Sequence, residues 1–212
     1  MISPSFSDEK LDSPSLEDLI DVFEDRVRWW VLEPARALLD IPHGFVSAVC
    51  LLLTYFESYS IYYRGKDSSG QSKLFFREGF CDVFRNAKVN PTFLARVSDA
   101  LYGDARCGFF HDGIFRDRIL FSENFDAEFV VTVPRVGGKP DEAGSIESIL
   151  INPRSFAKAV EAHFVAYVKA LRDTNNASLR TNFEAAVNTK WSPGTSVVIG
   201  MAESEFNPRK TT

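Results

Sequence analysis

The stretch Phe45-Val-Ser-Ala-Val-Cys-Leu-Leu-Leu-Thr-Tyr-Phe56 is the longest apolar run in the sequence, and it decides the fold class. Glu57 follows directly, so the run is shorter than the roughly 20 apolar residues that span a bilayer. We therefore expect a helix over residues 42–63 at the centre of a helical bundle. If Glu57 were tolerated in lipid, the uncharged segment would extend from Ile41 to Tyr63, so a membrane-associated helical protein is the weaker alternative.

Further helices are expected on both sides of this segment. Apolar residues recur at three- and four-residue steps in residues 16–31, 73–87, 91–107 and 153–171, and a shorter helix is expected near residues 179–187. Ser13 and Pro14 indicate the start of the first helix, and Pro34 is expected to kink or end it. The spacing predicts an antiparallel bundle of four or five helices.

Between residues 118 and 152 the pattern changes. Short runs rich in Ile, Val and Phe predict three strands, at residues 118–122, 128–133 and 148–152. We expect a mainly α protein with a small antiparallel β-meander inserted between the fourth helix and the long C-terminal helix. The bundle with its insertion forms one domain over residues 15–190, between a flexible leader (1–14) and a C-terminal tail (191–212). The leader lacks the cationic start and apolar run of a signal peptide.

Composition narrows the function. Lysine and arginine total 24 against 29 aspartate and glutamate residues, a formal charge of −5. This excludes the broad cationic surface of a protein that coats nucleic acid, so any nucleic-acid contact must be local. Cys50, Cys81 and Cys107 form neither a disulfide framework nor a zinc pattern, which indicates a cytoplasmic protein without a metal or other cofactor. The 19 phenylalanines indicate a tightly packed interior and an apolar subunit interface.

The usual catalytic signatures are absent from the sequence. It has no phosphate-binding loop that ends in Lys-Ser or Lys-Thr, no two-histidine zinc helix and no Gly-x-Ser-x-Gly turn. Gly137-Gly138-Lys139 lacks the rest of the phosphate-loop pattern, and we interpret it as a hairpin turn. Of the three histidines, His43 and His163 are expected to be structural. His111 differs, because it follows an arginine in Arg106-Cys-Gly-Phe-Phe-His111 at the end of a helix.

Arginine and histidine together suit RNA cleavage. A guanidinium stays protonated and binds phosphate oxygens through paired hydrogen bonds, so Arg106 can stabilise a phosphoryl transition state. The imidazole of His111 can take a proton from a ribose 2′-hydroxyl or give one to a leaving 5′-oxygen, without a metal. Arg116 and Arg118 extend the basic cleft as substrate-binding residues. On a regular helix, however, the side chains of Arg106 and His111 point about 140° apart.

Two arrangements could bring this pair together. Gly108 and Gly113 could loosen or end the helix, or a second copy of the chain could supply its own Arg106 and His111. The second arrangement also accounts for the glycines, which permit another helix to approach.

The motif Arg106-Cys-Gly-Phe-Phe-His111 at the end of a bundle helix resembles the Arg-x(4–6)-His signature of HEPN domains, the higher-eukaryote and prokaryote nucleotide-binding superfamily. The resemblance implies a homodimer with facing motifs and a metal-independent endoribonuclease of the kind used in toxin–antitoxin, defence or stress systems. Arg106 would bind the phosphate and His111 would be the general acid and base. RNA and an antitoxin or other protein would be the partners.

Three features depart from the family pattern. Cys107 stands where many active members carry asparagine or aspartate, Gly113 replaces the tyrosine of one antitoxin-silenced subgroup, and the β-rich insertion is an addition. The alternative is therefore a non-catalytic dimeric module for interaction or nucleotide binding. In that case Arg106 would pair with Asp104 or Glu78, and His111 would be a residue favoured at a helix C-terminus.

Overall fold

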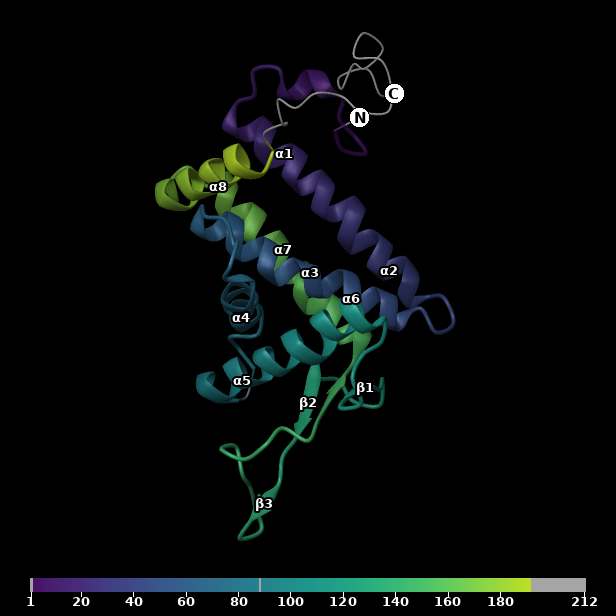
Figure 1. Ribbon diagram of the computed structural model, residues 1–212. Helices are drawn as coiled ribbons and strands as arrows, with labels where there is room; N and C mark the ends of the chain where they lie inside the picture. Colours follow the sequence, from purple (N-terminus) through teal and green to yellow (C-terminus); the bar gives the residue numbers. More distant parts are fainter. Residues whose placement is uncertain (1, 88, 192–212) are drawn as a thin grey trace.

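The structure is a computed structural model that describes residues 2–87 and 89–191. It confirms a mainly helical fold with a small β insertion (Figure 1). At the centre lies α3 (Phe45–Arg64), which contacts α2 (Glu33–Leu39), α4 (Ser72–Val83), α7 (Pro153–Arg172) and α8 (Ala177–Lys190). Among the described helices, only α3 has the length and apolar composition of a membrane span, and half of that span is buried inside the protein. This burial fits a core helix.

The first helix continues past the proline that was expected to kink or end it. α1 (Leu16–Val27) begins at Ser15, whose hydroxyl accepts the Asp18 backbone N–H while the Asp18 carboxylate accepts the Ser15 N–H. A π-helical turn, η2 (Arg28–Leu32), then leads directly into α2, with Pro34 in its first turn. Proline lacks an N–H and crowds the preceding turn, and the wider π turn accommodates both effects without a break.

The leader was expected to be flexible, but residues 2–12 pack against α1. It contains a short 3-10 helix, η1 (Asp8–Leu11). The Ser5 N–H and hydroxyl donate to the Asp25 carboxylate at 2.8 and 2.7 Å, and Arg26 Nε donates to the Ile2 carbonyl at 2.8 Å. Asp25 is buried, so these donors satisfy a charge that burial would otherwise destabilise. The expected tail lies outside the described residues after Trp191.

One helix carries the Arg-x4-His motif. α5 (Pro91–Leu101) starts at Asn90, whose side chain accepts the Phe93 N–H. It runs on through a second π turn, η3 (Tyr102–Cys107), into α6 (Gly108–Asp112). Gly113 ends the helix with φ +76°, a conformation that glycine adopts without strain.

The strand order differs from the predicted meander. β1 (Ile119–Phe121), β2 (Phe129–Thr132) and β5 (Ser148–Ile151) form a mixed sheet in the order β1-β5-β2. β5 is parallel to β1 and antiparallel to β2. The predicted meander was wrong because strand segments of this length specify pleat and burial, whereas the long 133–147 connection lets the last strand insert between the first two. That connection contains a hairpin of β3 (Arg135–Val136) and β4 (Lys139–Pro140), which projects beyond the helices (Figure 1).

The phenylalanines fill the interior of the bundle. The ring of Phe56 on α3 makes edge contacts with the rings of Phe76, Phe80 and Phe156 at centroid distances of 5.3–5.8 Å. The inward faces of β2 and β5 join the same core through Phe129, Ile149 and Ile151. The insertion is therefore packed on the bundle as part of one domain.

Candidate functional site

Arg106 lies in the η3 turn and faces α3. Its Nη2 donates to Glu57 Oε2 at 3.1 Å, and its guanidinium carbon lies 5.3 Å from the centre of the Tyr102 ring. Ser68 donates to the other oxygen of Glu57 at 2.8 Å. The Arg106 side chain is 30% exposed, and that of Glu57 is 15% exposed. The carboxylate and the ring together fix the direction of the guanidinium, while part of it stays in contact with solvent.

His111 lies on α6 in the last turn before Gly113, and it is exposed. Five residues correspond to about 7.5 Å along a helix axis, so the two motif residues share one end of the helix. The π turn loosens the helix only as far as Cys107, and α6 is regular. The two side chains therefore leave the helix in different directions, and the helix of one chain does not pair them.

Gly108 serves a different purpose from the expected approach of another helix. A Cβ there would lie 3.1 Å from the carbonyl oxygen of Ile114 and 3.5 Å from Arg116 Cγ. The absence of a side chain thus admits the loop that follows α6 in the same chain. This loop turns back along the helix and carries Arg116 and Arg118 toward Asp104.

Asp104 collects the two arginines that were expected to bind substrate. Arg118 Nε donates to its carboxylate, and Arg118 Nη1 also donates to the Ile146 carbonyl at 3.2 Å. Arg116 lies farther out, with Nη1 3.7 Å from the same carboxylate. Asp104 is buried, so this arrangement neutralises its charge and ties the insertion to η3. The structure therefore groups Arg116 and Arg118 with each other, and places Arg106 with Glu57.

Glu57 is the functional neighbour that the sequence analysis did not assign. It was noted only as the charge that interrupts the apolar run. A lone carboxylate in an otherwise apolar helix rarely stays buried without a partner, so its position was the available signal for a nearby cation. Asp104 and Glu78 were considered as partners of Arg106, but Asp104 pairs with Arg118 and Glu78 pairs with Arg64.

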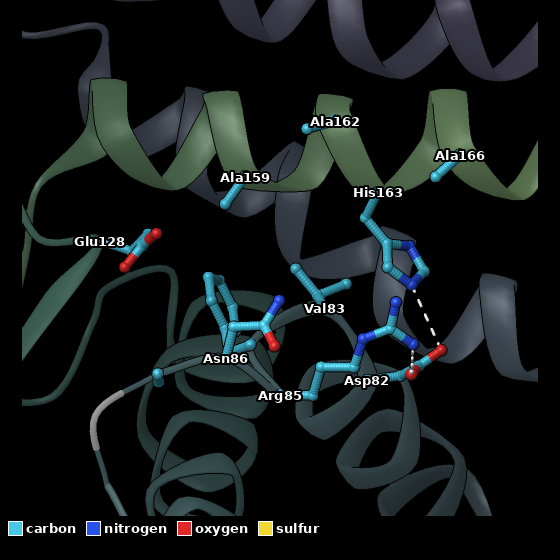
Figure 2. Close-up of a pocket in the computed structure, with 11 residues that line it drawn as sticks. Asp82, Val83, Arg85, Asn86, Glu128, Ala159, Ala162, His163 and Ala166 are labelled. Carbon is cyan, nitrogen blue, oxygen red and sulfur yellow. Dashed lines mark hydrogen bonds and ion pairs between the residues drawn. The ribbon is translucent and has the colours of Figure 1, made fainter.

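The remaining histidines are held by structure. His43 lies in the turn before α3 with φ +64°, the one non-glycine residue with positive φ in the described chain. His163 on α7 is 12% exposed at the rim of a pocket of about 320 Å³. Figure 2 shows its ring directed from α7 toward Asp82 at the end of α4, with Arg85 on the far side of that carboxylate.

The His163 ring is hydrogen-bonded on both sides. Nδ1 lies 2.8 Å from the Tyr55 hydroxyl, and Nε2 lies 3.3 Å from Asp82 Oδ2, which also accepts the Tyr59 hydroxyl. The hydrogen bond from His163, followed by that from Tyr59, outweighs burial and lowers the pKa of Asp82 to about 2. Burial, followed by hydrogen bonding and charge interaction with Asp82, raises the pKa of Tyr59. Because protein groups occupy both ring nitrogens, this cluster fastens α7 to α3 and α4.

No described group of three or more His, Cys, Asp or Glu side chains is placed to hold a metal ion, and Cys50, Cys81 and Cys107 are free thiols. The candidate site consists of Arg106, held by Glu57 and Tyr102, and the exposed His111 on the next turn. Comparison with known proteins gives no further assignment: no protein-family model matches the chain, and no curated protein or solved structure is similar to it.

Proposed function

We propose that this protein is a metal-independent endoribonuclease that works as a homodimer through Arg106 and His111. The observation that carries the proposal is the contrast between these residues: an arginine fixed by a carboxylate and an exposed histidine one turn away on the same helix. The spacing that resembles the HEPN signature supports it. A cytoplasmic location and an antitoxin or other protein partner belong to the same proposal.

The chemistry needs only these side chains and RNA. The His111 imidazole takes the proton of a ribose 2′-hydroxyl, and the 2′-oxygen forms a bond to the adjacent phosphorus. The bond from phosphorus to the 5′-oxygen breaks, and that oxygen takes a proton from a protonated imidazole. Arg106 stabilises the extra negative charge on the non-bridging oxygens. The products are a 2′,3′-cyclic phosphate and a free 5′-hydroxyl.

A second chain provides the missing geometry. The helix of one chain directs Arg106 and His111 apart, so a pocket with an arginine and an imidazole on either side of one phosphate requires the motifs of two chains. In such a pair, one imidazole can act as base and the other as acid. Light scattering of the purified protein should therefore give the mass of two chains.

Cleavage of labelled RNA in excess EDTA tests this function. The wild-type chain should release fragments, and His111→Ala should release none. Arg106→Ala should slow cleavage by about 10²–10³-fold, the loss typical when a donor to a developing oxyanion is removed. His43→Ala is the matched control, because it removes a histidine remote in sequence from the motif. Cleavage by the His111 variant at the wild-type rate would refute the proposal.

One observation favours a second function, a non-catalytic dimeric interaction or nucleotide-binding module. Arg106, Arg116 and Arg118 all have carboxylate neighbours, so the surface near the motif is less basic than the sequence suggested. A module of this kind would form dimers and bind RNA or nucleotide without turnover. Binding by the wild-type chain with no fragments over hours would assign this function instead.

A further inference from the structure

We infer that the β3–β4 hairpin is an RNA-binding arm whose tip contacts the phosphate backbone several nucleotides away from the cleavage site. This inference rests on the proposed function, because it takes RNA as the ligand. The observations that carry it are the shape of the hairpin, the charge at its tip, and its attachment to the helix that bears Arg106 and His111.

The hairpin is shaped to reach outward. β3 and β4 pair in antiparallel register, Arg135 opposite Pro140 and Val136 opposite Lys139. Gly137 and Gly138 both have positive φ, +59° and +82°, the pattern of a tight two-residue hairpin turn that favours glycine. In Figure 1 the hairpin extends away from the helices beyond β2. All residues from 135 to 140 are exposed, so the tip does not contribute to the core.

The tip carries two cations and one apolar side chain. Arg135 and Lys139 lie on the two short strands, and within the described residues neither forms an ion pair. Val136 between them is 67% exposed. Most other arginines around the candidate site are neutralised by carboxylates, so the tip is a place where uncompensated positive charge gathers on an acidic protein. Such charge recognises phosphate groups, and a two-stranded ribbon can follow a nucleic-acid backbone.

The base of the arm is fastened to the motif helix. Arg96 on α5 donates to the carbonyl oxygens of Glu142 and Gly144, and Asn90 donates to the Glu142 carboxylate. The Asp141 N–H donates to the Pro134 carbonyl at 2.8 Å and closes the base of the hairpin. These contacts hold the arm in a defined position relative to α5, η3 and α6.

The same helix sets the spacing. Arg96 and Arg106 are ten residues apart, about 15 Å along the helix axis. Stacked nucleotides rise about 3.4 Å each, so an RNA strand needs at least about four or five nucleotides to join the arm to the motif. A dinucleotide should therefore reach Arg106 and His111 without touching the arm.

RNA binding by an arm variant tests the inference. The substitutions Arg135→Gln and Lys139→Gln remove both cations, and Lys158→Gln with Lys169→Gln removes two exposed cations from α7 as the matched control. Both pairs are placed in a His111→Ala chain, so that binding is measured without cleavage. Far-UV circular dichroism confirms folding. The probe is a labelled 20-nucleotide single-stranded RNA, followed by fluorescence anisotropy from 50 to 200 mM salt.

The arm variant should bind more weakly and with less salt dependence. Each lost phosphate contact lowers the slope of log K against log salt by about 0.7, so two contacts change the fourfold salt series by about sevenfold. The control pair should keep the parental slope. In a chain with His111 intact, the arm variant should cleave a dinucleotide at the wild-type rate and a long RNA more slowly.

The outcomes separate the two proposals. If the parental chain binds RNA and the arm variant binds it with the same affinity and slope, the arm assignment is overturned while the nuclease proposal stands. If the chain with intact His111 cleaves nothing but the arm variant loses affinity, only the nuclease proposal fails. If the parental chain binds anionic lipid vesicles and no RNA, the RNA assignment of the arm is wrong.

Discussion

The contact between α3 and α4 predicts a large effect of one methyl group. Gly79 on α4 lies so close to α3 that a Cβ at this position would sit 2.1 Å from the carbonyl oxygen of Phe56 and 2.7 Å from its carbonyl carbon. Ordinary carbon to oxygen contacts begin near 3.3 Å. Both opposing atoms belong to the backbone, so no side chain can rotate away, and the helices must separate by about 1 Å. Gly79→Ala should therefore destabilise the fold.

The magnitude combines two opposing terms. Forced separation of packed elements costs about 1–3 kcal/mol or more, and replacing a helical glycine by alanine returns up to about 1 kcal/mol. The net loss is about 2 kcal/mol, which for a chain of this size lowers the melting temperature by about 4–8 °C. Urea unfolding followed by far-UV circular dichroism measures the free energy of unfolding, and a thermal scan measures the midpoint.

Gly103→Ala is the matched control. A Cβ at Gly103 in the η3 turn has no neighbour within 4 Å, so alanine there should be neutral or stabilise by up to about 1 kcal/mol. The two substitutions are chemically identical and should have opposite signs. If Gly79→Ala unfolds at the wild-type urea concentration, the close packing of α3 on α4 is refuted.

Three further variants test other parts of the structure. Asp82→Asn should cost about 1–2 kcal/mol at neutral pH, allowing for partial exposure, because the His163 hydrogen bond lowers the pKa of this carboxyl from 3.8 to about 2. That contribution is complete above about pH 4 and is lost as pH falls toward 2, so urea titrations should converge there; a difference independent of pH would contradict the assignment. Glu57→Gln should leave Arg106 less firmly held and slow RNA cleavage about tenfold, with the same products; an unchanged rate would show that Glu57 does not position the arginine. Asn152→Ala removes the side chain that accepts two N–H groups at the start of α7, and it should lower the free energy of unfolding by about 1–2 kcal/mol in the same urea assay.

The helices were predictable because their signals are local. Asn90-Pro91 gives a cap and first turn, and Gly113 stops a helix, so the ends of the motif helix follow from neighbouring residues. Pro34 shows the limit of local signals. It was expected to kink or end a helix, but a π turn that no residue pattern announced carries the chain past it.

Long-range pairings could not be predicted from one sequence. The parallel pairing of β1 with β5 depends on which strand enters the middle of the sheet, and the strand patterns are the same for either order. The partner of Arg106 lies 49 residues away on another helix, and only the isolated charge of Glu57 in an apolar run hinted at it. His163 and Asp82 are 81 residues apart, and nothing in their local sequence connects them.

Mass spectrometry of the RNA 3′ ends tests the central claim most directly. RNA incubated with the wild-type chain in excess EDTA should carry 2′,3′-cyclic phosphate at every new 3′ end, and the His111→Ala chain should produce no such ends. Linear 3′-hydroxyl ends, or cyclic ends formed equally by both chains, would contradict the assignment of this chemistry to Arg106 and His111.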